Sequence, residues 1–198
     1  MVAIVAIALL APLADAEDGS LPADDGFLQC KLLVATARIG DPRFSHTVIY
    51  MIDHDADGAM GLVVNRAYGT GPLNELLEGF GIDAVHVRET VRLHYGGSVE
   101  PSRGFVLHSD DYSGPGTRVV AAGVALSTGA DVLEALADGT GPERRLFILG
   151  YAGWGPGQLE GELARDDWVT APADASLIFS DDLDSLWDEA ISRAGVAL

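Results

Sequence analysis

Short apolar runs separated by turn residues are the feature of this sequence that most constrains its fold. The runs are rich in β-branched and aromatic residues, which favour strands. We expect strands at residues 31–37, 47–52, 59–65, 91–95, 104–108, 118–121, 146–151, 168–170 and 177–179. Because the strands outnumber the helices and do not alternate strictly with them, the pattern predicts an α+β fold with a mixed or antiparallel sheet.

Three or four helices are expected between these strands, because apolar residues recur there at helical spacing. Pro72 suits the first position of one helix, and Thr128 with Asp131 resembles the capping box of another. The expected helices cover residues 72–80, 128–139, 156–164 and 183–195. The last of them carries the clearest apolar stripe.

The charge of the chain restricts its partners. Of its 198 residues 48% are hydrophobic, which is enough to bury the core of one domain. Thirty acidic residues face twelve basic ones, so the net charge at pH 7 is −18, and no basic cluster is apparent. Nucleic acids and anionic membranes attract proteins mainly through Lys and Arg, so we expect no nucleic-acid partner and no binding to an anionic membrane surface.

The N-terminus begins with an apolar run at residues 2–13, followed by Ala-Asp-Ala. This pattern predicts a secretory signal peptide at residues 1–16, although the run lacks a preceding Lys or Arg; a buried strand is the alternative. Residues 17–30, which are acidic as far as Gly26, are expected to form a flexible lead-in to a domain at residues 31–198. With a cleaved signal the protein is periplasmic or secreted and has no stable membrane anchor, and otherwise it is cytoplasmic.

Metal-binding patterns are incomplete in this sequence. Residues 53–58 match the D-x-D-x-D-G opening of a calcium loop, but the twelfth position, which must be Glu, is Val64. Asp57-Gly58 between two apolar runs predicts a β-hairpin instead. The five histidines show no ligand spacing, and the single Cys30 excludes a disulfide framework or a multi-thiolate zinc site. We expect neither a metal nor a cofactor.

Glycines are densest at residues 150–160, which read GYAGWGPGQLE. In a loop, their free backbone N–H groups and the following helix N-terminus would suit an anion. The spacing fits neither the Walker motif nor the dinucleotide fingerprint, and Glu160 and Glu162 would repel an anion. The favoured interpretation is therefore a tight strand-to-helix turn in which Trp154 fills the core.

Several blocks of the sequence resemble the AlgH/YqgE family, in the same order from about Leu33 to the final helix. These blocks are FSHTVIY (44–50), GAMGLVVNR (58–66), YGGSVE (95–100), RGFVLH (103–108) and the stretch 149–162. The resemblance implies a single α+β domain whose strongly bent sheet forms a pseudo-barrel packed with about four helices. It brings no agreed enzymatic activity or cofactor, because members are usually described only as regulators. Members are generally cytoplasmic, so the apparent signal segment is a departure.

The favoured function is a non-enzymatic binding or regulatory protein with an unknown protein or small-molecule partner. No catalytic residue is assigned, since no nucleophile–base pair or G-x-S-x-G elbow is recognisable. The residues expected at the binding surface are Asn65, Gly96, Gly97, Arg103, His108, Gly153, Trp154, Gly155 and Gly157.

Two other functions stay open. One is an enzyme that acts on a small anionic ligand at residues 150–157, where Arg103 would supply positive charge. A histidine would move a proton there, and the candidates are His54, His94 and His108. The other is a DNA-binding transcriptional regulator, which the net charge of −18 disfavours.

Overall fold

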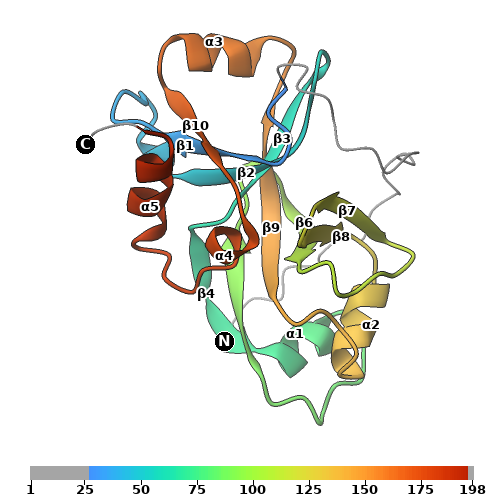
Figure 1. The fold of residues 1–198 in the computed structure, drawn as a ribbon. Helices are drawn as coiled ribbons and strands as arrows, with labels where there is room; N and C mark the ends of the chain where they lie inside the picture. The colour runs from blue at the N-terminus through green and yellow to red at the C-terminus, as the bar shows by residue number, and fades with distance from the viewer. Residues whose placement is uncertain (1–26, 196–198) are drawn as a thin grey trace.

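One long strand, β9 (Arg145–Trp154), organises the sheet (Figure 1). The computed structural model describes residues 27–195, and within them the strand order is β10-β1-β2-β3-β9-β6-β8-β7. A branch leaves β9 through β5 (Thr90–Tyr95), which pairs parallel to β9 and antiparallel to β4 (Ala67–Pro72). The remaining strands are β1 (Lys31–Ala35), β2 (Val48–Asp55), β3 (Gly58–Val63), β6 (Val99–His108), β7 (Thr117–Ala121), β8 (Val124–Ser127) and β10 (Trp168–Pro172).

The central position of β9 follows from its sequence. Successive residues of a strand face opposite sides of the sheet. Leu146 and Ile148 enter the core that contains Leu177, whereas Phe147 enters a second core, which contains Leu73. A strand that is covered on both faces is apolar at consecutive positions, as this one is from Leu146 to Leu149.

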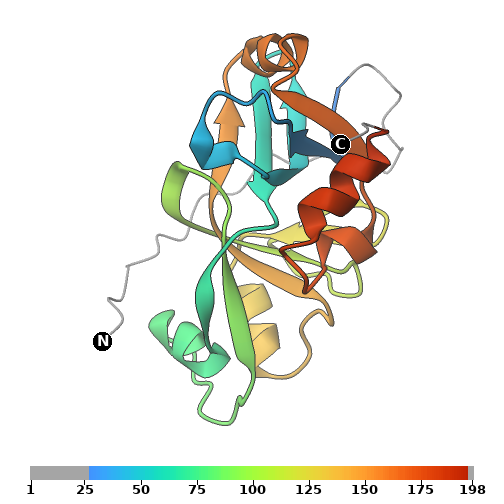
Figure 2. The same cartoon turned by 90° about the vertical axis from the view of Figure 1, so that its left-hand side faces the viewer.

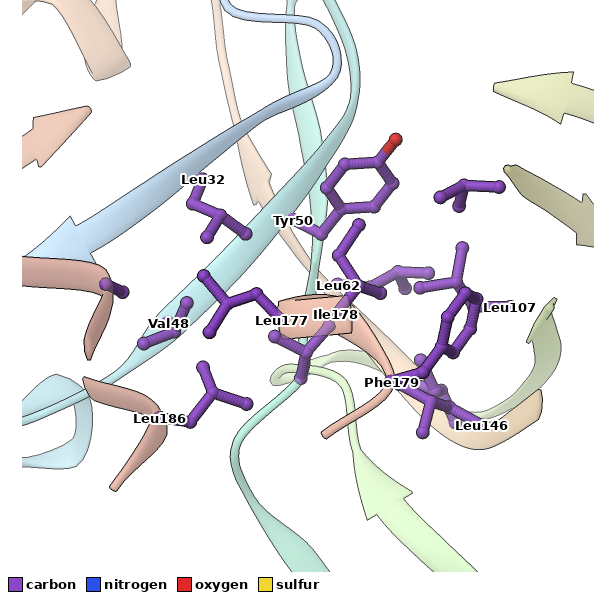
Figure 3. Close-up of a cluster of buried hydrophobic side chains, with 14 of the residues drawn as sticks. Leu32, Val48, Tyr50, Leu62, Leu107, Leu146, Leu177, Ile178, Phe179 and Leu186 are labelled. Atoms are coloured by element: carbon purple, nitrogen blue, oxygen red, sulfur yellow. The ribbon is translucent and has the colours of Figure 1, made fainter. Parts of the chain in front are cut away.

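The helices cover separate regions of the sheet (Figures 1 and 2). α1 (Leu73–Gly79) and α2 (Asp131–Ala137) lie at one end of the molecule, and α3 (Gln158–Ala164) lies at the other. α4 (Ala175–Ile178) and α5 (Leu186–Arg193) pack on the side, and a short 3-10 helix covers Pro42–Phe44. In Figure 3, Leu32, Tyr50 and Leu62 from β1–β3 gather with Leu177 and Phe179 in the largest core.

The predicted α+β class with a strongly bent mixed sheet is confirmed, and the described residues hold five α-helices instead of about four. The additional helix is α4, so the strand expected at residues 177–179 is wrong. Asp174 accounts for the difference, because its carboxylate accepts a hydrogen bond from the backbone N–H of Leu177 (3.0 Å) and caps the helix. Leu177 and Ile178 are buried from this short helix.

Two strands carry no clear sequence signal. β4 reads Ala-Tyr-Gly-Thr-Gly-Pro and is mostly exposed, so it lacks apolar alternation. β8 has only four residues, Val-Ala-Leu-Ser, which are too few to show a pattern. It follows β7 after the two-residue turn Ala122-Gly123, in which Gly123 has a φ of +78°.

The predicted capping box of α2 is wrong. Ala130 is the N-cap, and the Asp131 carboxylate accepts a hydrogen bond from the Tyr112 hydroxyl (3.1 Å).

The predicted hairpin after Asp53 is confirmed, since Asp55 pairs with Gly58 across a two-residue turn. The Asp53 carboxylate binds the Arg118 guanidinium through two hydrogen bonds, of 2.8 and 3.0 Å. Within residues 27–195 no group of His, Cys, Asp or Glu side chains is arranged to hold a metal ion. The ion pair of Asp53 with Arg118 ties β2 to β7.

The predicted signal peptide at residues 1–16 lies outside the described residues, as does most of the expected lead-in. Leu28, in the part of the lead-in that is described, donates its backbone N–H to Nδ1 of His54 (3.0 Å). No helix among residues 27–195 is both long enough and apolar enough to cross a membrane.

Candidate functional site

Asn65 braces two strands. Its Oδ1 accepts a hydrogen bond from the backbone N–H of Val48 (2.9 Å), and its Nδ2 donates to the backbone oxygen of His46 (2.7 Å). Both ends of the amide therefore hold the start of β2 against the end of β3. These contacts give Asn65 a structural role.

Gly96 and Gly97 allow the connection between β5 and β6 to cross the middle of β9. A Cβ at Gly96 would lie less than 3.0 Å from the carbonyl oxygen of Gly150. A Cβ at Gly97, whose φ is +152°, would lie less than 3.0 Å from the backbone of Tyr151 and Ala152. Only glycine permits this approach of two backbones without strain.

Arg103 packs its guanidinium on aromatic rings. Its Cζ lies 5.2 Å from the centre of the Phe105 ring and 5.9 Å from that of Tyr151, within the range of a cation–π contact. Nη1 binds the Glu100 carboxylate at 3.2 Å, and Nε is buried without a hydrogen-bond partner. Gly153 also packs near the Tyr151 ring. The structure thus gathers Gly97, Arg103 and Gly153 around Tyr151.

The glycine-rich segment is more regular than a loop. β9 continues through Trp154, and its residues pair with β3 as Ala59 with Trp154, Met60 with Gly153, and Gly61 with Ala152. Only residues 155–157 form the turn into α3, and there the N–H of Gly155 donates to Oε1 of Gln158 (3.2 Å). The tight turn favoured for this segment is therefore confined to residues 155–157, and the alternative of a loop with free N–H groups from residue 150 onward is wrong.

Trp154 is part of the core, as the favoured interpretation held. It is 8% exposed and meets Trp168 edge to face, with 6.2 Å between ring centres. The indole N–H groups of both tryptophans donate to Oε2 of Glu162, at 2.9 Å from Trp154 and 2.8 Å from Trp168. Gly155 and Gly157 are exposed at the turn above this pair, and Gly157 has a φ of +71°.

Replacing Glu162 with leucine is expected to lower the free energy of unfolding by about 2 kcal/mol, because both indole N–H groups then lose their acceptor. Urea denaturation followed by tryptophan fluorescence measures the change. Glu162→Gln is the matched control: its amide oxygen still accepts, so its loss should be smaller than that of Glu162→Leu. Equal losses in the two variants would contradict this role of the carboxylate.

His108 is coupled to a hydroxyl group in the interior. Its Nε2 lies 2.8 Å from Oγ of Ser127, and its Nδ1 lies 2.7 Å from the backbone oxygen of Ser109, to which it donates. Oγ of Ser127 also lies 2.8 Å from Oγ1 of Thr117. Burial lowers the pKa of His108. Because His108 and Ser127 have no exposed surface, this arrangement is a buried polar network.

The other two candidate histidines lie apart from His108. Nε2 of His54 binds the Glu160 carboxylate at 2.9 Å, which ties β2 to α3. His94 is on β5 and His108 is on β6, on opposite sides of β9. These two strands do not pair with each other. The contact between His94 and His108 that such pairing would have allowed therefore does not form.

A polar cleft of about 460 Å³ collects three arginines that the sequence analysis did not select. Arg92 projects from β5, and Arg144 and Arg145 lie where β9 begins. We call this region the arginine cleft; its lining residues are Thr70, Thr90, Val91, Arg92, His94, Glu143, Arg144, Arg145, Leu146, Phe147, Phe179 and Asp181. Its volume lies in the usual range for small-molecule sites.

The three guanidinium groups differ in their contacts. Arg145 forms an ion pair with Glu89. Arg92 donates to the backbone oxygen of Asp181 at 3.0 Å, and the carboxylate of that residue, which is fully exposed, is 3.9 Å away. The Arg144 guanidinium stacks over the Phe179 ring at 5.0 Å and makes no hydrogen bond or ion pair within the described residues. Arg144 is therefore free to bind an anion.

His94 lines the cleft and is 1% exposed. The pKa of His94 is lowered to about 4, mainly by burial and to a smaller extent by the nearby positive charge of Arg92. The imidazole is thus neutral at pH 7. Its Nδ1 is buried without a hydrogen-bond partner.

The expectation that the chain has no basic cluster is corrected by this cleft. Three of the twelve basic residues line one cleft of a chain with a net charge of −18, against the two carboxylates of Glu143 and Asp181. Arg144-Arg145 is the one adjacent basic pair in the sequence and was an available signal. Arg92 could not be linked to it, because the link depends on the pairing of β5 with β9.

Another cavity in the described residues is much smaller. It measures about 50 Å³ and lies beside Arg103 between apolar side chains of β6, β9, α1 and α2. A site for a small organic ligand usually exceeds 300 Å³. The arginine cleft is therefore the candidate functional site.

These features define an α+β protein with a half-barrel sheet and an arginine-lined cleft at the branch of β5 from β9. The AlgH-like family matches residues 32–198. The chain belongs to this family, which confirms the resemblance seen in its glycine-rich blocks.

Relatives and solved structures agree with this assignment. A UPF0301 protein of Methylococcus capsulatus is 54% identical over 168 residues, which cover 85% of this chain and 92% of that protein. A UPF0301 protein of Rhodospirillum rubrum is 44% identical, with coverages of 87% and 90%. The solution structure of AlgH from Pseudomonas aeruginosa matches with a TM-score of 0.73 and 40% identity, covering 90% and 94% of the two chains. A crystal structure from Corynebacterium diphtheriae, at 19% identity, has the same fold with a TM-score of 0.66 and coverages of 89% and 90%.

Proposed function

We propose that this protein is a non-enzymatic binding protein for small anionic ligands, and that the ligand occupies the arginine cleft. The observation that supports this function is the gathering of Arg92, Arg144 and Arg145 around one cleft in a strongly acidic chain. Guanidinium groups bind phosphate and carboxylate oxygens through paired N–H donors, so several of them around one cavity favour an anion.

The contacts of the cleft support binding more than catalysis. Two histidine–hydroxyl pairs, the buried pair of His108 with Ser127 and the exposed pair of His46 with Ser45, lie outside the cleft lining. The rival site for an enzyme, residues 150–157, is not an open loop, because β9 pairs with β6 at Tyr151 and with β3 at residues 152–154. A regulatory role would follow if ligand occupancy changed the affinity for a protein partner.

Titration with pyrophosphate at low ionic strength tests the proposal. We expect saturable binding by calorimetry, with amide shifts in nuclear magnetic resonance spectra confined to the cleft. Replacing Arg144 with alanine should weaken binding by about tenfold, which corresponds to about 1.4 kcal/mol. Arg144 suits this test because its guanidinium is free of ion pairs with the described residues, so the substitution leaves no carboxylate unpaired there.

Arg38→Ala is the matched control, because Arg38 is an exposed arginine that pairs with Asp166 away from the cleft. It changes the net charge by the same amount and should leave the affinity for pyrophosphate close to that of the wild type. Equal weakening by both substitutions would show a nonspecific charge effect and would overturn the proposal. Absence of saturable binding in the wild type would overturn it as well.

Asp181→Asn is expected to strengthen pyrophosphate binding by a few-fold, because it removes a carboxylate 3.9 Å from the Arg92 guanidinium that competes with the anion. Asp184→Asn, also exposed and outside the cleft lining, is the control for the change in net charge. The same calorimetric titration measures both variants. An Asp184→Asn variant that binds as tightly as Asp181→Asn would contradict a local effect.

A further inference from the structure

We infer that the natural ligand of the arginine cleft is a phosphomonoester that also carries a hydroxyl group, as a sugar phosphate does, and that Nδ1 of His94 accepts a hydrogen bond from that hydroxyl. This inference rests on the proposed function. It assigns each half of the ligand to a different part of the cleft: the phosphate to the arginines and the hydroxyl to the imidazole.

The hydrogen-bonding state of His94 carries the first step. The ring is hydrogen-bonded to the backbone of Val64 in a contact that favours the protonated form, so a ring N–H donates to the Val64 carbonyl. Nδ1 has no partner, which leaves Nε2 as that donor. In a neutral imidazole with its proton on Nε2, Nδ1 is an acceptor. Nδ1 of this cleft-lining histidine is therefore an acceptor without a hydrogen-bond donor.

An unsatisfied buried acceptor is costly, about 1–3 kcal/mol, and a buried polar atom usually has a partner. Of the buried side-chain atoms without partners in residues 27–195, Nδ1 of His94 is the one whose residue lines the cleft. An anion alone does not satisfy it, because an oxyanion offers only acceptors. A ligand that combines an anionic group with a hydroxyl satisfies both the arginines and the histidine.

The size and lining of the cleft suit an organic phosphate better than a bare anion. A volume of about 460 Å³ exceeds what a bare phosphate fills and suits a small organic molecule. Thr70 and Thr90 add hydroxyl groups that can both donate and accept, and the Phe179 ring with the stacked Arg144 adds a flat wall. Three guanidinium groups favour a doubly charged phosphate over a single carboxylate, because each phosphate oxygen can accept from more than one N–H.

The test compares glucose 6-phosphate with inorganic phosphate on the full chain by calorimetry. We expect glucose 6-phosphate to bind about tenfold more tightly, which is the effect of one or two additional hydrogen bonds. In His94→Phe this advantage should disappear while the affinity for inorganic phosphate is retained. His94→Gln is the matched control, because its side chain keeps one donor and one acceptor and should retain part of the advantage.

A measurement on the wild type avoids dependence on the folding of these variants. The ¹⁵N resonance of Nδ1 of His94 should move on addition of glucose 6-phosphate, in the direction of an acceptor that gains a hydrogen bond, and stay in place with inorganic phosphate. Equal affinity for the two ligands, or an unmoved Nδ1 resonance at saturation with glucose 6-phosphate, would overturn this inference and leave the proposed function standing. If neither ligand binds, the proposed function itself fails.

Discussion

Gly97→Ala is expected to destabilise the protein by about 4 kcal/mol or more, a loss large enough to unfold many domains of this size. Two independent effects add at this position. The new Cβ would lie less than 3.0 Å from the backbone of Tyr151 and Ala152, which belongs to the central strand and cannot move aside. In addition, the φ of +152° is one that residues with a side chain rarely adopt. Urea denaturation followed by circular dichroism measures the loss.

Gly155→Ala is the matched control for this substitution. Gly155 lies in the exposed turn after β9, where an added Cβ meets no atom within 4 Å and φ is not positive. We expect a change within about 0.5 kcal/mol for this variant. A Gly97→Ala protein with near-wild-type stability would show that the connection before β6 does not pack against β9 as described.

The glycine-rich blocks show how sequence patterns can indicate the right region for a different reason. The blocks identify the family correctly, but the sequence alone does not show whether their residues bind a ligand or are needed for packing. In the structure, Gly96 and Gly97 are required where two backbones cross, Asn65 links two strands, and Trp154 fills a core. These are positions at which few other residues fit, so a distinctive sequence can reflect packing as easily as ligand binding.

The architecture was largely predictable because most strands are recognisable from their local sequence. The β2–β3 hairpin was indicated by Asp57-Gly58 between apolar runs, although Gly58 begins β3 and the turn itself is Ala56-Asp57. α5 follows from its apolar stripe. β4 was not predictable, since its exposed residues gain their structure from pairing with β5 rather than from their own preferences. Strand propensity depends strongly on such tertiary context.

The arginine cleft was not predictable because it forms from distant segments. Arg92 and Arg144 are separated by 52 positions in the sequence and meet only because β5 runs parallel to β9. Phe179, which supports the Arg144 guanidinium, comes from a segment expected to be a strand and found at the end of α4. Long-range pairing of this kind leaves no periodic signal in a single sequence. The net charge of −18 also gives no sign that three arginines lie close together.

His94 is expected to make the protein sensitive to mild acid. The unfolded chain has an ordinary histidine pKa near 6.5, whereas burial lowers the pKa of folded His94 to about 4. Between these values the unfolded state binds more protons, so stability is full above pH 6.5 and is lost as the pH falls towards 4. The loss from this group amounts to about 3 kcal/mol. Burial also lowers the pKa of His108, which adds to the decline in the same direction.

Urea denaturation at intervals between pH 7 and pH 4 measures this decline, and His94→Gln isolates the contribution of His94. The amide of glutamine keeps a donor for Val64 and an acceptor for the cleft but does not titrate, so the variant should lose less stability than the wild type over the same range. His86→Gln, at an exposed position, controls for the removal of an imidazole. Because the carboxylates titrate in all three proteins, their effect cancels in the comparison. Parallel pH profiles for the wild type and His94→Gln would mean that His94 is protonated in the folded protein as readily as in the unfolded chain. A neutral acceptor at this lining residue of the arginine cleft would then no longer be supported.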